Sequence, residues 1–219
     1  MKKYLCLLAV IGLLLPSACF ALQLKMPEMS EKNSYSYENP VLGYSLRVPK
    51  ALVSLPDSDL AEILDNAHSR AGFGEDDYLY DVRIWGMAAS ASDTLVLEVQ
   101  LKKCTHTDFE TEVANAPNYS ERQEAQQAEQ GNDVSITMLH DGILRETPAG
   151  TMLEMACVWH CTDADGTPRD TMHVYYDYYC NSIEYCFVLE APERLVTLEG
   201  MQKLLADIME TVRIENVIE

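Results

Sequence analysis

The clearest pattern in the chain is an alternation of hydrophobic and polar residues between residues 151 and 190. Residues 151–161 place a hydrophobic side chain at every second position, at Leu153, Met155, Cys157 and Trp159. A period of two residues is typical of a half-buried β-strand. Residues 183–190 alternate in the same way, and residues 172–180 are rich in tyrosine, which suits a pleated surface. Turn-forming residues separate the three runs, so the stretch predicts three consecutive antiparallel strands.

The register between the last two of these strands follows from the short turn that joins them. Asn181 and Ser182 can close a two-residue turn, which places Tyr178 opposite Tyr185. One continuous hydrophobic face is then expected along the three strands. We expect the rest of the chain to cover this sheet.

Further strands are predicted on both sides of this central stretch. Asp141 and Gly142 favour a turn after one of them, leading into a second short strand over residues 143–149. Hydrophobic alternation and β-favouring residues indicate strands over residues 42–49, 79–88, 94–103 and 134–140.

Helices are indicated by capping signals. Asp59 followed by Glu62 resembles a capping box that opens a helix reaching about Ser69. Leu60 and later hydrophobic residues give this helix one apolar stripe. Two further short helices are predicted by the pairs Thr107/Glu110 and Ser120/Gln123.

The last two helices differ in their hydrophobic surface. Residues 121–130 are almost wholly polar, so this helix is expected to lie exposed or to touch a partner. A final helix is predicted from Pro192 to about Arg213, because proline suits a first helical turn and leucine, isoleucine and methionine recur at three and four residues. We expect its broad hydrophobic face to lie across the sheet.

These elements predict an α+β fold, a twisted antiparallel sheet flanked by helices. The strand GYSLRVP ending at Pro49, the helix after it, the long antiparallel meander and the closing helix resemble the PsbP/Mog1/DcrB family over roughly residues 41–214. The resemblance implies an α/β/α sandwich. It also implies a binding or assembly role, since members include photosystem extrinsic subunits, a small-GTPase-binding protein and envelope lipoproteins. No binding residue of the family matches a position of this chain.

The start of the chain is typical of an export signal. Lys2 and Lys3 precede a hydrophobic run over residues 4–15, which is shorter than the roughly 20 residues that span a bilayer. Cleavage after Ala21 would remove residues 1–21 as a signal peptide. The alternative is lipidation at Cys19, because Pro16-Ser17-Ala18-Cys19 resembles a lipobox with proline in place of leucine. Either route exports the chain, to the periplasm or the exterior.

The remaining sequence is expected to form one domain. Residues 22–40 show no sustained period and are interpreted as an N-terminal linker, followed by a single domain over residues 41–219. The formal charge is −19, and it becomes −21 if Lys2 and Lys3 are lost with the leader. Such a charge repels nucleic acids and anionic lipids, so we expect a protein or small-molecule partner and membrane contact only through a lipid anchor.

Five cysteines lie beyond the leader: Cys104, Cys157, Cys161, Cys180 and Cys186. On one strand, Cys157 and Cys161 would lie about 13 Å apart, whereas a disulfide needs Cα atoms within about 7 Å. Cys180 and Cys186 fall on opposite faces of their hairpin. The spacing therefore favours buried thiols at Cys157 and Cys186.

Two groups of residues contain side chains of the types that bind metal ions. Zinc bound by Cys157, His160, Cys161 and His173 would require converging ligands, yet alternation points His160 away from both cysteines. The alternative arrangement places His160 and His173 opposite each other across the hairpin, as exposed cross-strand neighbours. Asp163, Asp165 and Asp170 with Gly166 contain only a fragment of a calcium loop. We assign no metal, no cofactor and no catalytic residue, and His140-Asp141 lacks a matching nucleophile motif.

The candidate binding face consists of His160, His173, Tyr175, Asp177 and Tyr179. On the middle strand, Tyr175 and Tyr179 share a side with His173 and Asp177. If helices cover only the other side, this row is a stacking surface for a ligand or a protein; if helices cover both sides, it is core. We expect a non-enzymatic binding or assembly protein of the bacterial envelope. The alternatives are an enzyme using His160, His173 and Asp177, and a purely structural envelope protein.

Overall fold

The computed structural model of the chain describes residues 23–69, 79–90, 93–103, 109–162, 166–180 and 182–215. The predicted signal peptide and Cys19 lie outside these ranges, as do Cys104, Asp163 and Asp165, so the interpretations that rest on them stay predictions. Within the described ranges, no helix combines the length and the hydrophobicity needed to cross a bilayer.

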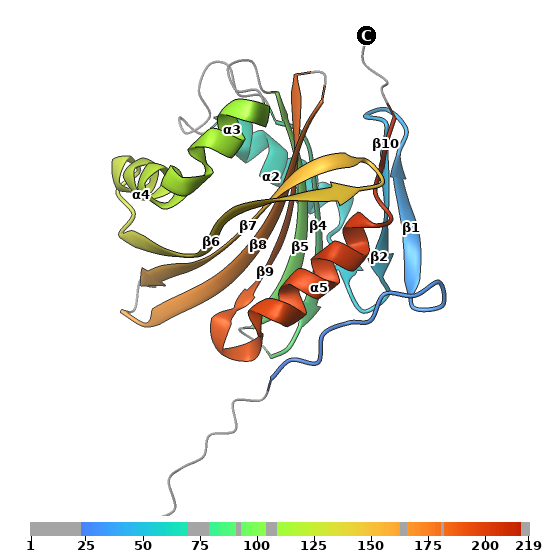
Figure 1. Cartoon of the computed structure of the whole chain (residues 1–219). Helices are drawn as coiled ribbons and strands as arrows, with labels where there is room; N and C mark the ends of the chain where they lie inside the picture. Colours follow the sequence, from blue (N-terminus) through green and yellow to red (C-terminus); the bar gives the residue numbers. More distant parts are fainter. Residues whose placement is uncertain are drawn as a thin grey trace, which may run out of the picture.

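A seven-stranded antiparallel sheet forms the centre of the fold (Figure 1). The strand order is β3-β4-β5-β9-β8-β7-β6, so the predicted meander of three strands is confirmed as β7, β8 and β9. Tyr178 lies opposite Tyr185, as the two-residue turn predicts. The strands are β3 (Val53–Ser54), β4 (Leu79–Ala88), β5 (Thr94–Lys103), β6 (Val134–Thr147), β7 (Gly150–Thr162), β8 (Pro168–Cys180) and β9 (Ile183–Pro192).

A second, three-stranded sheet has the order β1-β2-β10, with β1 (Ser34–Asn39), β2 (Tyr44–Pro49) and β10 (Arg213–Ile214). The prediction that residues 22–40 form a linker is wrong for β1, which pairs with β2 along its whole length. Tyr35 and Tyr37 pack against the core from this strand, whereas serines fill the alternate positions. Serine and tyrosine give only a weak hydrophobic contrast, and the alternation was therefore missed.

The helices are α2 (Asp57–Ser69), α3 (Phe109–Asn115), α4 (Tyr119–Glu129) and α5 (Leu198–Met209), with short 3-10 turns η1 (Ala116–Asn118) and η2 (Glu193–Leu195). The last helix does not begin at Pro192, which ends β9 instead. It begins at Leu198, where the Thr197 hydroxyl accepts a hydrogen bond from the Gly200 N–H and caps the helix.

The large sheet is covered on both faces. One face packs against α5 and β2 around a core that includes Phe187 and Leu97. The other face packs against α2 through Leu60, and against η1 and α4 through Ala116 and Tyr119. Figure 1 shows α5 and the small sheet on one side of the large sheet and α3 with α4 on the other. The predicted α+β class with a twisted antiparallel sheet between helices is confirmed.

The predicted turn at Asp141-Gly142 is wrong, because β6 runs through it as one strand. Its pairing with β7 shifts register between Met138 and His140 and again between His140 and Ile143. Gly142 adopts a φ of 120°, and an added Cβ would lie 3.0 Å from the Cβ of Ala116. The glycine therefore permits an irregularity within the strand and a close approach of η1, rather than a chain reversal.

Candidate functional site

The predicted binding face lies on β8, under the helices α3 and α4. His173, Tyr175, Asp177 and Tyr179 share one side of the strand. The ring of Tyr119 at the start of α4 lies 5.7 Å from that of Tyr175, and Phe109 of α3 lies 6.1 Å from Tyr179. Tyr175 is 8% exposed and Asp177 is 7% exposed. This tyrosine row is therefore packed beneath helices rather than open to solvent.

His160 does not belong to this face. It pairs with Asp170 across the hairpin, while His173 pairs with Cys157 three positions earlier, so the two histidines point to opposite sides. The interpretation of His160 and His173 as facing neighbours is wrong. His160 instead contacts Asp170 and Thr137 at 2.9 Å each. Neither the zinc set with His160 nor the enzymatic set of His160, His173 and Asp177 is brought together.

His173 lies in an aromatic stack. Its ring lies 5.7 Å from Tyr175, with planes 12° apart, and 5.4 Å from Trp159. Burial lowers the pKa of His173 from 6.5 to about 4, so the imidazole is neutral at neutral pH. Burial likewise raises the pKa of Glu190, which lies 3.7 Å away, to about 7. A neutral, stacked histidine here is a packing residue.

Four ionisable groups meet further along the same face. Asp177 of β8 lies directly opposite Cys186 of β9, and Glu184 lies two residues before Cys186 on the same side. One ligand-type atom from each of these three residues lies within 4.8 Å of the others. The ammonium of Lys102 on β5 lies 3.1 Å from Glu184. Sequence reasoning singled out Asp177 and Cys186 separately but did not join them.

The charge balance of this cluster is incomplete. Burial, followed by the negative charge of Glu184, raises the pKa of Asp177 from 3.8 to about 7, and the Cys186 thiol and Lys102 only partly oppose the shift. Burial also raises the pKa of the Cys186 thiol well above its ordinary value. Among the described residues, Lys102 is therefore the single cation beside two carboxyl groups, those of Asp177 and Glu184, in a site with little access to water.

A second buried carboxylate connects α5 to the sheet. Glu154 of β7 is 2% exposed and accepts hydrogen bonds from Arg145 Nε at 2.9 Å and from Tyr176 and Gln202 at 2.6 Å. His140 Nε2 lies 3.3 Å away. Despite burial, these donors lower the pKa of Glu154, so it stays ionised at neutral pH. The hydrogen bonds from Arg145, Tyr176 and Gln202 join β6, β8 and α5 to β7, which indicates a structural role.

An open cleft lies between the β1–β2 hairpin, β4 and the start of α2. Its volume is about 540 Å³. The hairpin contributes the end of β1 and the turn that follows it, whereas β4 contributes the charged residues Asp81 and Arg83. The lining consists of Tyr37, Glu38, Asn39, Pro40, Val41, Leu42, Asp57, Tyr80, Asp81 and Arg83.

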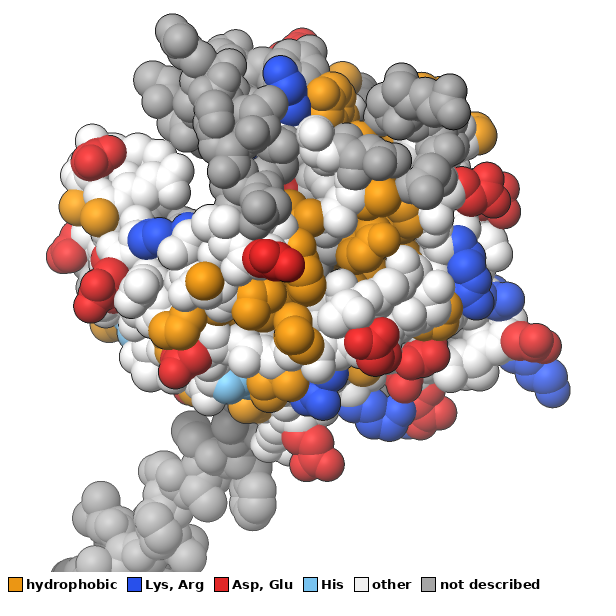
Figure 2. All heavy atoms as spheres, turned by 45° about the horizontal axis from the view of Figure 1, so that its top comes forward, with side chains coloured by type: hydrophobic (Ala, Val, Ile, Leu, Met, Phe, Trp, Pro, Cys, Tyr) orange, Lys and Arg blue, Asp and Glu red, His pale blue; other side chains and the backbone are white. Residues whose placement is uncertain are grey.

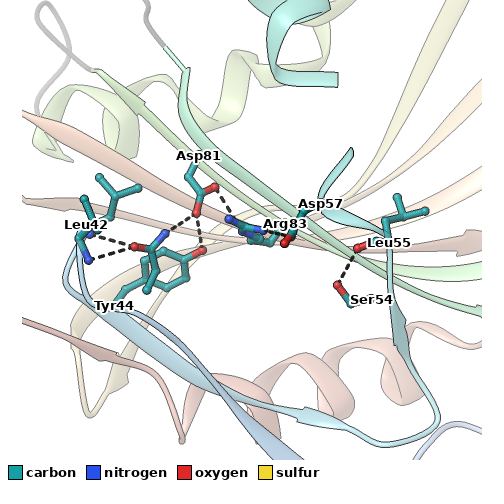
Figure 3. Close-up of polar contacts among 9 residues, drawn as sticks. Leu42, Tyr44, Ser54, Leu55, Asp57, Asp81 and Arg83 are labelled. Carbon is teal, nitrogen blue, oxygen red and sulfur yellow. Dashed lines mark hydrogen bonds and ion pairs between the residues drawn. The ribbon is translucent and has the colours of Figure 1, made fainter. Parts of the chain in front are cut away.

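Asp81 is the centre of the polar contacts in this cleft (Figure 3). Its Oδ2 accepts hydrogen bonds from Asn39 Nδ2 at 2.8 Å and from the Tyr44 hydroxyl at 3.0 Å. Its Oδ1 lies 3.3 Å from Arg83 Nε. Burial and the charge of Asp81 raise the pKa of Tyr44 far above its ordinary value, so the hydroxyl remains a donor. Asp81 therefore ties the small sheet to the large one.

Arg83 lies between two carboxylates and an aromatic ring. Its Nη1 lies 3.0 Å from Asp57 Oδ1, and its guanidinium carbon lies 5.6 Å from the ring centre of Tyr37. The Arg83 side chain is 25% exposed and that of Asp57 is 92% exposed. Contact with Asp57 therefore lies at the water-facing end of the network, where a cationic group of a ligand can compete with Arg83 for the Asp57 carboxylate.

Hydrophobic side chains reach the surface at the edge of this cleft. Val41 is 77% exposed and Tyr80 is 37% exposed. Elsewhere, over the described part of the face shown in Figure 2, hydrophobic side chains are interspersed with acidic ones. Sequence reasoning missed this cleft because residues 34–40 were taken as linker. The one available signal was a pair of opposite charges at Asp81 and Arg83, two residues apart on a predicted strand.

Comparison with known proteins gives fold-level similarities. No family model matches the chain, and no curated protein matches it in sequence. It is similar to cyanobacterial PsbP (CyanoP) from Synechocystis, with a TM-score of 0.49 and 9% identity over 88% of this chain and 98% of that one. It is also similar to a Bacteroides thetaiotaomicron protein (TM-score 0.39, 10% identity, 85% of this chain and 50% of that one).

A third similar structure is LpqN of Mycobacterium tuberculosis, described as involved in cell envelope biogenesis. Its TM-score is 0.33, with 14% identity over 71% of this chain and 96% of that one. The resemblance to PsbP is thus found again in the general arrangement of the elements.

Proposed function

We propose that the chain is an exported, non-enzymatic binding or assembly protein of the bacterial cell envelope, and that the cleft between the β1–β2 hairpin and β4 receives its partner. The observation that supports this proposal is the combination, in one open cleft, of fixed polar groups with exposed hydrophobic side chains at the edge. Concave sites of this composition are typical of ligand recognition.

The polar part of the cleft is held in place before any partner arrives. Asp81 is fixed by Asn39 and Tyr44, and it lies beside Arg83. Side chains that are already held lose little conformational entropy on binding, which favours affinity. Val41 and Tyr80 can add apolar contact area without further rearrangement of the strands.

The charges of the lining favour a neutral or cationic partner. Glu38, Asp57 and Asp81 supply three carboxylates against the single guanidinium of Arg83. The chain as a whole carries a formal charge of −19. A basic segment of another envelope protein fits both properties, whereas a nucleic acid would be repelled.

The contacts within the cleft support binding rather than catalysis. The carboxylate of Asp81 and the guanidinium of Arg83 are directed at one another and at neighbouring donors and acceptors. A general acid or base must instead reach a bound substrate. Among the described residues that line the cleft, the charged groups of β4 are engaged in holding the two sheets together.

Site-specific crosslinking in the native host tests this proposal. A photoreactive residue at position 41 lies at the cleft, whereas one at position 53 is similarly exposed, at 70% for Val53, but lies outside it. We expect the chain in the envelope fraction, with a discrete crosslinked species from position 41 and none from position 53. Identical patterns from both positions, or a chain that stays in the cytoplasmic fraction, would contradict the proposal.

A further inference from the structure

We propose that Asp177, Glu184 and Cys186 form a binding site for a thiophilic divalent cation such as Zn²⁺. The three side chains come from the paired strands β8 and β9, and Asp177 lies directly opposite Cys186. One carboxylate oxygen from each acidic residue and the sulfur of Cys186 lie within 4.8 Å of one another. Three converging ligand atoms on rigid neighbouring strands are the arrangement that a metal site requires.

One oxygen of the Asp177 carboxyl group lacks the contact that its burial demands. The residue is 7% exposed, and its Oδ1 atom is buried without a hydrogen-bond partner. A buried acceptor without a donor is costly, and a buried carboxylate without a counter-charge is more so. A cation held between Asp177, Glu184 and Cys186 would supply both the missing contact and the missing charge.

The ligand types indicate which cations suit the site. Mg²⁺ and Ca²⁺ prefer oxygen ligands alone, whereas Zn²⁺ accepts cysteine sulfur together with carboxylate oxygen. The thiol of Cys186 therefore selects a borderline or soft cation. On binding, the metal–sulfur bond forms as the thiol proton leaves to solvent. Three protein ligands leave one position of a tetrahedral ion for water.

Lys102 is the competitor for this site. Its ammonium lies 3.1 Å from Glu184 and satisfies part of the negative charge. A single positive charge does not balance both carboxylates, and it leaves the Oδ1 atom of Asp177 without a partner. The Lys102 side chain is flexible, so binding of a cation requires its ammonium to be displaced from Glu184.

Titration of the reduced protein with Zn²⁺ tests the proposal, with Cd²⁺ as an optical probe of thiolate binding. The variants are Asp177→Asn and Cys186→Ser, which each remove one ligand. Cys157→Ser is the matched control, because Cys157 is a buried thiol of the same face but lies opposite His173. Calorimetry gives affinity and stoichiometry, ultraviolet absorption reports the cadmium–thiolate bond, and melting curves show that each variant folds.

We expect wild type and Cys157→Ser to bind one Zn²⁺ at this site and to melt at a higher temperature with it. Each ligand variant should bind at least about tenfold more weakly, since even an outer partner of a metal site contributes about 10–100-fold. Cys186→Ser should also lose one cadmium–thiolate band. Asp177→Asn removes a buried charge, so we expect this variant to fold. It therefore tests the metal site even if Cys186→Ser fails to fold.

A third variant tests the role of Lys102. Because the ammonium competes with the ion, Lys102→Gln should bind Zn²⁺ more tightly than wild type while keeping all three ligands. The proposal is overturned if wild type binds no Zn²⁺ with a stabilising effect, or if Asp177→Asn binds it as wild type does. If Lys102→Gln binds Zn²⁺ as tightly as wild type or more weakly, the claim that Lys102 competes with the ion is wrong.

Discussion

The substitution Glu154→Gln should weaken the attachment of α5 to the large sheet. Glu154 is ionised and buried, and it accepts hydrogen bonds from Arg145, Tyr176 and Gln202, the last of which belongs to α5. Glutamine has nearly the same shape, but its amide places an NH₂ group where the carboxylate had an acceptor. At least one donor then loses its partner, whichever way the amide is turned.

The expected loss is about 2 kcal/mol of unfolding free energy. Three hydrogen bonds to a charged acceptor contribute about 1.5–3 kcal/mol each, and burying the carboxylate costs several kcal/mol in return. Arg145 is 48% exposed at its side chain, so it regains water after the substitution. The Tyr176 hydroxyl, which donates at 2.6 Å, is buried and has no such compensation.

The difference should depend on pH in a defined direction. The pKa of Glu154 is lowered below 4.5 in the folded state by its three donors, against the effect of burial. An acid with a lowered folded pKa stabilises the fold above its unfolded pKa, and this contribution is lost as the pH falls through the folded value. The gap between wild type and Glu154→Gln should therefore be constant near neutrality and shrink below about pH 4.5.

Urea unfolding followed by tryptophan fluorescence measures this gap at neutral and acidic pH. Glu146→Gln is the control, because Glu146 is exposed and accepts a hydrogen bond from Thr151; it should change stability by less than about 0.5 kcal/mol. A Glu154→Gln variant as stable as the control at neutral pH would refute the reasoning. So would a gap that widens on acidification.

Two other substitutions test the core and the stacked histidine. Phe187→Ala empties a fully buried position at the centre of the large sheet, so it should lower the unfolding free energy by about 3–5 kcal/mol in the same urea assay. His173→Phe should remove a pH dependence: the pKa of His173 is lowered from 6.5 to about 4, so wild type loses up to about 3 kcal/mol between pH 6.5 and pH 4 relative to the variant. A gap between wild type and His173→Phe that does not change over this interval would show that His173 is not buried as a neutral group.

The sequence predicted the long strands of the large sheet, with β6 divided in two, because their hydrophobic contrast is strong; the two-residue β3 was not predicted. Residues 79–88 and 94–103 were predicted with the bounds that the structure shows. The wrong predictions concern residues that are compatible with two kinds of local structure. Pro192 suits a first helical turn but ends a strand, and Asp141-Gly142 suits a turn but lies within β6.

The candidate sites depend on pairings that alternation alone does not fix. The cleft forms because Asn39 and Asp81, 42 residues apart, meet across the two sheets. The two histidines were mispaired because the loop between β7 and β8 sets the register, which places Thr162 opposite Pro168. A shift of the turn by one residue changes the partner of every residue in the hairpin. The alternation within each strand does not determine where the turn lies, so it does not determine these pairs.

The register shifts in β6 bear on the association of one molecule of this protein with another. In the described sheet, β6 is a terminal strand, with Leu139, Ile143 and Leu144 exposed along it. A straight terminal strand with such side chains offers its free backbone amides to a neighbouring molecule and can start amyloid-like stacking. The two irregularities around His140 interrupt that row of amides. The distortion at Gly142 is thus expected to reduce edge-to-edge association of molecules in a concentrated solution.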